Sequence, residues 1–563
     1  MTWTQNYNPL GNALLSTLVA ATPIVVLLGS IAFFRIRAHF SALLGLSVAM
    51  AVALWVCQMP LTSTLASAAY GAAYGLFPIG WIVLNLIFLY RLTVDQGLFP
   101  ALGASLAKLA PDPRIQVILV AYCFGAFLEG AAGFGTPVAV TAAILISLGF
   151  RPLQASGLAL IANTAPVAFG SIGTPIIAIS TVTGLDLLKL SAMVGRQLPV
   201  FSLLVPFWVV CAFGGWRALI GVWPAALTAG LGFAIPQFLV SNFHGPWLVD
   251  LVSSLCSMGA LAGLLMVWRP REQWSLAAAP RPVAEPSKPE FSHMAIVRAW
   301  VPWLILTSMI FIWGIPQVRD FLNGETVASG GQKHLQPWAA FSRVELAVPK
   351  LHQMVQRVLP VAPPNAPPEK ALFVVNWLSA TGTGILIAAI LASLAMRLSI
   401  GQFFRCYGQT ILRLRLSLLT IATMLALGYV TKYSGTDAIL GLALAKTGVL
   451  YPFFGTMLGW LGVALTGSDT ASNVLFGSLQ KITAEQTGLS PILMCAANST
   501  GGVMGKMVDP QSIVVASTAT GWFGQEGPIL RYVFLHSVAL AALVGLLVFL
   551  QAKVPPFISM VVR

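Results

Sequence analysis

Charged side chains are scarce in this sequence, and their scarcity excludes most classes of soluble protein. Of the 563 residues only 9% are Asp, Glu, Lys or Arg, whereas 57% are hydrophobic, and the mean hydropathy is +0.84. A soluble domain carries roughly 25% charged residues. Apolar stretches of about 18 to 25 residues recur along the chain, each long enough to cross a bilayer as a helix. We therefore expect an all-α polytopic membrane protein.

Several chemical signatures are also missing. The six cysteines form no CxxC pair and lie mostly in apolar runs, which argues against a disulfide framework or a metal site. No nucleophile has a base at catalytic spacing, and the histidines lie in loops or near span ends, so we expect neither an enzyme nor a cofactor. The net charge of +14 is spread over short loops without a continuous basic face, which argues against nucleic acid as a partner.

The apolar pattern predicts about twelve crossing helices and two hairpins. The first charged residue is Arg35, so the first apolar run lacks the basic region of a cleavable signal peptide and is expected to remain as a span. Two apolar segments, 115–149 and 453–480, are split by glycines around an acid, and we interpret them as re-entrant hairpins. The crossing helices are expected near 12–34, 40–58, 67–91, 153–182, 190–213, 217–240, 246–268, 299–317, 371–396, 411–430, 490–520 and 530–551.

Two polar segments divide the chain. The proline-rich segment 269–297 is expected to be a cytoplasmic linker between an N-terminal membrane half, 1–268, and a C-terminal half, 298–563. The segment 319–370 is expected to be an external loop and carries no functional signal. Lysines and arginines are more numerous in the loops on the linker side, so the positive-inside rule places both termini on the opposite, periplasmic side.

The two halves share an internal repeat at an offset of 335 to 338 residues. It pairs Lys108 with Lys446, Asn163 with Asn498, Pro175 with Pro510, and the segment STVTG with STATG. The span count makes the copies, about 67–213 and 411–551, run in opposite directions. Inverted repeats with interrupted helices are typical of secondary transporters, which bind substrate between the copies. The alternative is that glycine, alanine and serine recur because membrane helices pack closely.

Two acids lie inside the predicted hairpins at nearly equivalent positions. Glu129 occurs in FLEGAAGFGTP and Asp469 in LTGSDTASN. A charged carboxylate at a helix centre costs about 3 kcal/mol on insertion scales, so it is kept where it faces a polar cavity or has a function. A carboxyl group that alternates between wet and dry surroundings suits proton coupling. The alternative is that each acid only accepts hydrogen bonds from neighbouring backbone amides.

The segments after the hairpins predict a site for a small anion. The helical pattern is interrupted by NTAP and GSIGTP in 161–176, and by NSTGG and VDPQ in 496–511. Free backbone amides at the start of a half-helix suit a carboxylate ligand. The alternative is that Asn and Thr only cap a kink. The predicted substrate-binding residues are Asn163, Thr164, Gly173, Thr174, Ser468, Thr470, Asn473, Asn498, Ser499, Thr500 and Gln511.

Two cations are predicted at membrane depth. Arg196 in MVGRQLP and Lys506 in MGKMVDP are candidates to neutralise a substrate carboxylate. Alternatively, Lys506 pairs with Asp509 three residues later, and the side chain of Arg196 extends to the membrane interface.

Five long motifs resemble the bacterial lactate permease family. They are YCFGAFLEGAAGFGTPVAVTAAIL (122–145), ANTAPVAFGSIGTPI (162–176), MVGRQLP (193–199), GWLGVALTGSDTASNVLF (459–476) and AANSTGGVMGKMVDPQSI (496–513). The resemblance implies an inner-membrane permease that takes up L-lactate, D-lactate and glycolate with protons. It also implies the ion-transporter fold, in which inverted repeats each contain a hairpin and an unwound helix, often in elevator-type homodimers.

The sequence therefore favours a symporter of protons and small 2-hydroxymonocarboxylates. Glu129 and Asp469 are the candidate proton-coupling residues. A sodium-coupled carrier of another organic anion remains open, because SDTASN and NSTGG offer the oxygen ligands that hard cations prefer. An anion channel is a further alternative.

Overall fold

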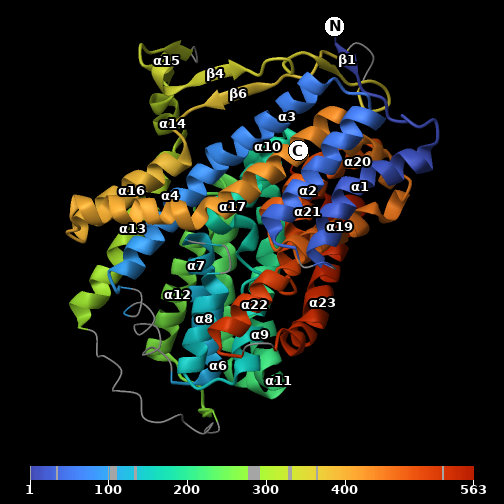
Figure 1. Ribbon diagram of the computed structural model, residues 1–563. Helices are drawn as coiled ribbons and strands as arrows, with labels where there is room; N and C mark the ends of the chain where they lie inside the picture. The colour runs from blue at the N-terminus through green and yellow to red at the C-terminus, as the bar shows by residue number, and fades with distance from the viewer. Residues whose placement is uncertain are drawn as a thin grey trace.

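A helical body with a small set of strands at one end makes up the structure, a computed structural model (Figure 1). It describes the chain except residues 1, 33, 35, 99–100, 102–110, 132, 134–135, 277–291, 328–332, 363–365, 523–524 and 563. Lys108, most of its repeat segment and most of the linker therefore lie outside the described residues. Because a bilayer core offers no water to backbone amides and carbonyls, helices that satisfy these groups internally are the expected solution.

The helices of the two halves follow the predicted order. The first half contains α1 (Ala13–Ala32), α2 (Ala38–Ala51), η1 (Val52–Val56), α3 (Leu61–Tyr74), η2 (Gly75–Gly80), α4 (Trp81–Asp95), α6 (Pro113–Gln116), η3 (Val117–Phe124), α7 (Gly125–Ala131), α8 (Thr136–Ser147), α9 (Pro152–Ala162), η4 (Val167–Phe169), α10 (Gly170–Thr183), α11 (Leu187–Phe243) and α12 (Val249–Val267). The second half contains α13 (His293–Gly314), α14 (Pro316–Leu322), α15 (Ala339–Ser342), α16 (Thr381–Ala395), α17 (Ile400–Ser434), α18 (Thr436–Ala445), η5 (Gly448–Leu450), α19 (Tyr451–Thr466), α20 (Asp469–Gln486), α21 (Pro491–Gly505), α22 (Pro510–Ala519), α23 (Glu526–Lys553) and η6 (Phe557–Met560).

Fewer helices than expected have the length and hydropathy of a membrane span. Within the described residues there are eight, or ten if each of two bent helix pairs counts as one span. Part of the difference from the predicted twelve comes from short apolar helices, such as Ala13–Leu27 and Thr381–Ala395. The predicted span at 371–396 starts late because 372–375 forms a strand before α16 begins at Thr381.

One long helical element contains two of the predicted spans. The backbone of α11 leaves helical geometry at Gly214 and Gly215, where Gly215 has a φ of 70°. The two limbs return alongside each other, because the hydroxyl of Ser191 donates to the carbonyl oxygen of Ser241 at 2.9 Å. These limbs match the spans predicted at 190–213 and 217–240.

The segment 319–370 builds most of the strands. The strands are β1 (Trp3–Thr4), β2 (Glu325–Val327), β3 (Lys333–Leu335), β4 (Val344–Ala347), β5 (Val355–Gln356) and β6 (Leu372–Val375), and they form three two-stranded sheets. The N-terminal β1 pairs in parallel with β5. Both chain termini lie at the end of the molecule that carries the strands (Figure 1).

The long helix α17 lies across α2, α3 and α4 (Figure 1). Its first turn is capped by Ser399, whose hydroxyl accepts from the amide of Gln402 at 3.3 Å. Glycines of α3 allow close packing: a Cβ at Gly71 would lie 2.7 Å from the Cα of Ala426, and one at Gly75 would lie 2.6 Å from that of Ala422. Residue numbers increase along α3 where they decrease along α17, so the two helices are antiparallel.

Contacts between the halves come in reciprocal pairs. The broken-helix segment α10 packs against the hairpin limb α20, and α22 packs against the hairpin limb α8. In the same way α11 packs against α21, and α23 packs against α9. In the repeat, α10 corresponds to α22, α20 to α8, α11 to α23 and α21 to α9. Each contact of a pair is therefore the repeat counterpart of the other.

We expect Gly71→Ala to destabilise the protein, because the new methyl group would lie against the backbone of α17. Overpacking of this kind costs about 1–3 kcal/mol. The melting temperature of the purified full-length protein in detergent measures the effect.

The matched control is Gly408→Ala on α17, where a Cβ meets no atom within 4 Å. Replacing an exposed helical glycine by alanine stabilises by about 0.5–1 kcal/mol. Equal melting temperatures for the two variants would contradict the close packing of α3 and α17.

Candidate functional site

Two helical hairpins form the framework of the candidate site. In the first, α6, η3 and α7 form the outgoing limb and α8 forms the returning limb; a Cβ at Gly125 would meet the side chain of Thr141. In the second, α19 and α20 meet at Gly467 and Ser468, and the hydroxyl of Ser472 donates to the carbonyl oxygen of Gly459 at 3.2 Å. The limbs of both hairpins are antiparallel neighbours, as predicted for 115–149 and 453–480.

The helix that follows the first hairpin is broken in the middle. Its halves, 152–162 and 167–183, are bent by 64°. Asn163 ends α9, and Ser171, Ile172 and Gly173 have positive φ angles of 46°, 57° and 74°. This left-handed turn interrupts the backbone ladder where NTAP and GSIGTP predicted a break.

The helix that follows the second hairpin is broken at only one of the two predicted interruptions. The motif NSTGG does not interrupt it, because α21 continues through Asn498 to Gly505. The break falls at VDPQ instead, where the side chain of Asp509 caps α22 by accepting from the amide of Ser512 at 2.8 Å. Pro510 explains the position, since it lacks the amide hydrogen that would continue the ladder.

Glu129 is buried and contacts the first break. It lies in the last turn of α7, and its Oε2 accepts a hydrogen bond from the side-chain amide of Asn163 at 3.2 Å. Gly170 leaves space for this carboxylate, because a Cβ there would lie 2.7 Å from Oε1. The structure therefore brings together two predicted residues, one from the hairpin and one from the broken helix.

Asp469 forms the corresponding cluster in the second half. Its Oδ2 accepts from the hydroxyl of Ser499 at 2.5 Å and from the side-chain amide of Asn473 at 3.3 Å. The side-chain amide of Asn498 donates to Oδ1 of Asn473 at 2.9 Å. Asp469 opens the returning limb of its hairpin, whereas Glu129 ends the outgoing limb, so the two acids are on opposite limbs.

Lys506 connects the second hairpin tip to the second break. Its Nζ donates to the carbonyl oxygen of Gly467 at 2.6 Å and lies 3.3 Å from Oδ2 of Asp509. The ion pair with Asp509 is the alternative that the sequence left open. The lysine is only 7% exposed, and the nearby acid compensates for burial of its charge.

The other predicted residues lie at varied distances from these clusters. Thr164 and Thr174 are buried and donate to carbonyl oxygens of Ile161 and Ser171, and Gly173 packs against Pro246. Ser468 caps α20, Thr500 donates to Gln197 at 2.9 Å, Thr470 is half-buried, and Gln511 is exposed. Arg196 donates to Asn242 and to the carbonyl oxygen of Met560, none of which is a predicted site residue.

Buried glutamines extend the polar cluster, and sequence reasoning missed them. Gln197 accepts from Thr500 and donates to Gln551 at 3.0 Å, so it joins α11, α21 and α23. Gln480 donates to Oδ1 of Asn498 at 3.1 Å. A signal was available, because Gln197 lies within MVGRQLP and a glutamine inside an apolar helix must find hydrogen-bond partners.

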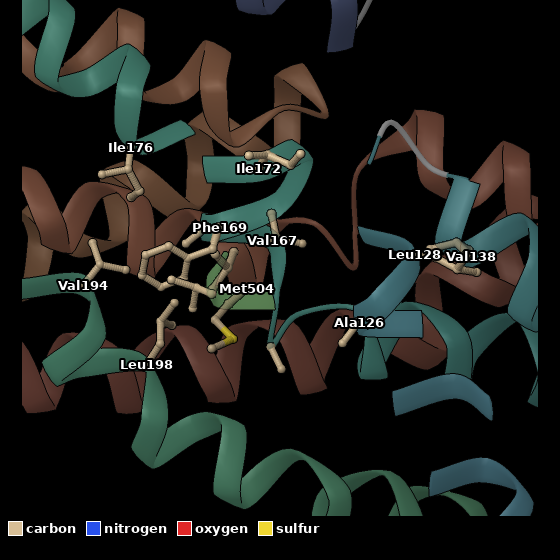
Figure 2. Packing of buried hydrophobic residues seen from close by; sticks show 14 of the residues in the cluster. Ala126, Leu128, Val138, Val167, Phe169, Ile172, Ile176, Val194, Leu198 and Met504 are labelled. Carbon is tan, nitrogen blue, oxygen red and sulfur yellow. The ribbon is translucent and has the colours of Figure 1, made fainter. Parts of the chain in front are cut away.

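Apolar side chains seal the space around the first break. Phe169, Leu198 and Met504 lie close together, so the break of one half packs against α21 of the other (Figure 2). The side-chain amide of Asn473 also crosses between the halves and donates to the carbonyl oxygen of Pro175 at 3.2 Å. The two acidic clusters therefore belong to one packed interior.

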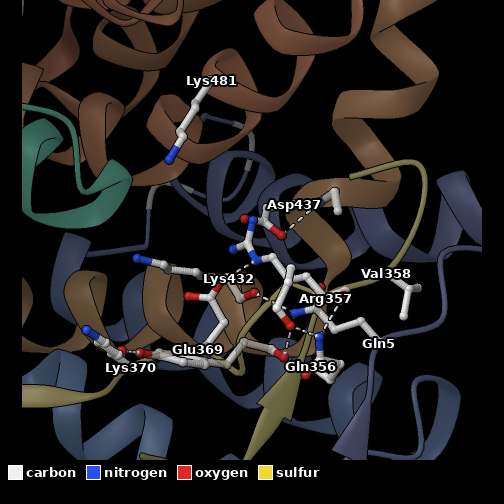
Figure 3. A network of polar contacts seen from close by, with 12 residues as sticks. Gln5, Gln356, Arg357, Val358, Glu369, Lys370, Lys432, Asp437 and Lys481 are labelled. Carbon is white, nitrogen blue, oxygen red and sulfur yellow. Dashed lines mark hydrogen bonds and ion pairs between the residues drawn. The ribbon is translucent and has the colours of Figure 1, made fainter. Parts of the chain in front are cut away.

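A charged network borders this interior at the end that carries the strands (Figure 3). Lys432 of α17 donates to the carbonyl oxygen of Val182 at 2.9 Å, and Lys481 of α20 donates to that of Thr183 at 3.0 Å. Both carbonyls belong to the last turn of α10, where the helix dipole favours cations. Arg357 of the 319–370 segment pairs with Glu369 at 3.0 Å.

Fold and site together define a multi-pass helical membrane protein with buried acids at paired hairpins and broken helices. The chain belongs to the L-lactate permease family, which matches residues 16–555.

Individual relatives resemble the chain over nearly its full length. It is 44% identical to the glycolate permease GlcA of Escherichia coli (strain K12), over 98% of this chain and 99% of that protein. It is 43% identical to the L-lactate permease of Bacillus subtilis (strain 168), with the same two coverages. The YdaH transporter of Alcanivorax borkumensis shows 14% identity and a TM-score of 0.45, over 85% of this chain and 86% of that one, and this likeness is too weak to support an argument.

We expect Gly502→Ala to reduce transport, because a Cβ at this position would contact Oδ1 of Asp469 and lie 2.8 Å from Cγ2 of Val463. The carboxylate would have to leave Ser499. A displacement of about 1 Å at a binding site can cost about a hundredfold in rate. Initial uptake of the labelled substrate by cells with matched amounts of protein measures the loss.

The control is Gly527→Ala in α23, where a Cβ meets no atom within 4 Å. If Gly502→Ala takes up substrate as fast as the control, transport does not depend on the position of the Asp469 carboxylate.

Proposed function

We propose that this chain imports small 2-hydroxymonocarboxylates, namely L-lactate, D-lactate and glycolate, in symport with protons. It acts as a secondary transporter rather than an enzyme, in the inner membrane of a bacterium, with both termini on the periplasmic side. The names of its relatives, a glycolate permease and an L-lactate permease, support this substrate class.

The observation that supports the proposal most directly is a buried polar site in which hydrogen-bond acceptors lack donors and which also contains the cation Lys506. Oδ1 of Asn163 and Oδ1 of Asp469 have no hydrogen-bond partner among the described residues. Buried acceptors without donors are costly, so a ligand that brings a hydroxyl hydrogen or a proton satisfies them. A 2-hydroxy acid brings the hydroxyl, and Lys506 at the second hairpin tip supplies positive charge for its carboxylate.

Proton coupling is assigned to Glu129 and Asp469. Each acid is buried and contacts side chains of the broken helix of its own half. A carboxylate in such a place interacts more favourably with its surroundings once it is protonated or pairs with a cation. Import of an anion with one proton therefore adds no net charge to the site.

Alternating access follows from two inverted copies, about 67–213 and 411–551. The reciprocal packing of α10 with α20 and of α22 with α8 supports a two-fold relation between them. Antiparallel packing of α3 and α17 is in keeping with opposite directions of the copies. We infer about twelve crossings, re-entrant hairpins, and an elevator-type homodimer as the working assembly.

A sodium-coupled carrier is the second candidate, because the oxygens around Asp469 also suit a hard cation. Uptake of labelled lactate into proteoliposomes separates the candidates when either a sodium gradient or a proton gradient is imposed alone. Accumulation driven by sodium without a proton gradient would overturn proton symport.

An anion channel is distinguished by counterflow. Unlabelled substrate on the far side accelerates the entry of label through a carrier. A channel shows no such acceleration, and this result would overturn alternating access.

We expect Glu129→Gln to abolish accumulation against a gradient while it leaves exchange partly intact. Glutamine keeps the size and hydrogen-bonding ability of the side chain but holds no transferable proton. Proton-driven uptake and counterflow in the same proteoliposomes measure the two activities.

Glu272→Gln is the matched control, since the side chain of Glu272 is 66% exposed in the loop after α12. If Glu129→Gln accumulates substrate as the control does, Glu129 has a structural role only.

A further inference from the structure

Another buried acid lies against the helix that carries Glu129. Asp250 is in the first turn of α12, is 2% exposed, and belongs to a helix that packs against α7 and η3. The contact is close, because a Cβ at Gly130 would lie 2.7 Å from the Cβ of Asp250. Gly130 follows Glu129 in the chain, so Asp250 packs against the turn of α7 that carries Glu129.

Asp250 lacks the partners that a buried carboxylate needs. Neither of its oxygens has a hydrogen-bond partner among the described residues. The titratable groups that interact with it are Glu129 on α7 and Tyr122 on η3, and neither is a cation. The hydroxyl of Tyr122 donates to the carbonyl oxygen of Ser202 at 2.7 Å and is therefore engaged elsewhere.

The first helix break, which Glu129 contacts, contains further acceptors without donors. Oδ1 of Asn163 and Oε1 of Gln237 are buried and have no partner in the described part of the chain. The side-chain amides of both residues are already used, by Glu129 and by the carbonyl oxygen of Ala165. An ionised carboxylate here would be far more costly to bury than a neutral acid, which also supplies a donor.

We propose that Asp250 is a second proton carrier of the first half, placed beside Glu129 so that one proton passes between the two carboxyl groups. This inference rests on the proposed proton symport. In the transfer, the O–H bond of Asp250 breaks and one forms on Glu129, so the negative charge moves from Glu129 to Asp250. The number of protons held by the pair stays the same.

The position of α12 couples this pair to the helix break. Pro246, in the loop before α12, packs against the left-handed turn of α10, because a Cβ at Gly173 would lie 2.7 Å from its Cβ. Glu129 reaches the same break through Asn163. A change of geometry at the break therefore alters the separation and solvation of the two carboxyl groups, which selects the one that holds the proton.

The test compares Asp250→Asn with wild type in full-length protein reconstituted into proteoliposomes. We expect the rate of proton-driven uptake of labelled lactate to fall by about a hundredfold or more, the usual contribution of a positioned proton-transfer group. Counterflow should persist. The infrared C=O band of protonated Asp250, which should persist in Glu129→Gln, should be missing from the spectrum of Asp250→Asn.

The matched control is Ser254→Ala, a buried position of the same helix whose hydroxyl donates to the carbonyl oxygen of Leu251. It should retain driven uptake and the infrared band. Asp250→Glu keeps an acid and should retain part of the driven uptake. This variant also provides the test if Asp250→Asn fails to fold.

Two outcomes would overturn the assignment. One is Asp250→Asn that accumulates lactate as wild type does. The other is a carboxyl spectrum that is the same in Asp250→Asn as in wild type or, if that variant does not fold, a carboxyl band that does not shift in Asp250→Glu. If wild type itself ignores the proton gradient and responds to sodium, proton symport fails first and this inference fails with it. If only the proposed role of Asp250 is wrong, uptake by wild type still responds to the proton gradient.

Discussion

The structure depends on one constraint: backbone groups freed by a broken helix must find partners within the protein, because the bilayer core offers none. Here hairpins and breaks supply each other's partners. Lys506, at the second break, donates to the carbonyl oxygen of Gly467 at the hairpin tip, and Asn473 donates to that of Pro175 in the other half. The polar interior is therefore a consequence of satisfying the breaks, and this satisfaction is incomplete at Oδ1 of Asn163 and Oδ1 of Asp469, which have no partner among the described residues.

Close packing of backbones makes the arrangement possible. Glycines occur where a side chain would collide with the neighbouring element, as at Gly71 against α17 and at Gly170 against Glu129. Small residues let membrane helices approach closely when no hydrophobic force drives them together. In this protein the same residue type serves both the scaffold and the acids, so glycine content alone does not locate the site.

Much of the architecture could be predicted because apolar length and proline position are local properties. The hairpins, the break at Asn163 and the return of α11 at Gly214 agree with the sequence. In the second copy the break predicted at VDPQ is confirmed and the one predicted at NSTGG is wrong, because the amide and hydroxyl side chains of NSTGG hydrogen-bond to residues of α20 and α11 while the helix continues. Gln197 and Asp250 were missed because their importance depends on contacts with other helices, and Asp250 lies outside the repeat that guided the search.

The two lysines at the C-terminal end of α10 belong to different parts of the molecule. Lys481 is carried by a hairpin limb, whereas Lys432 ends the long helix that crosses the first half. If hairpin and broken helix slide together past α17, Lys481 travels with the carbonyl that it holds, while Lys432 is left behind. The movement would then have to break the hydrogen bond from the ammonium group of Lys432 to the end of α10. The free energy of breaking it would add to the barrier between the two positions of the hairpin.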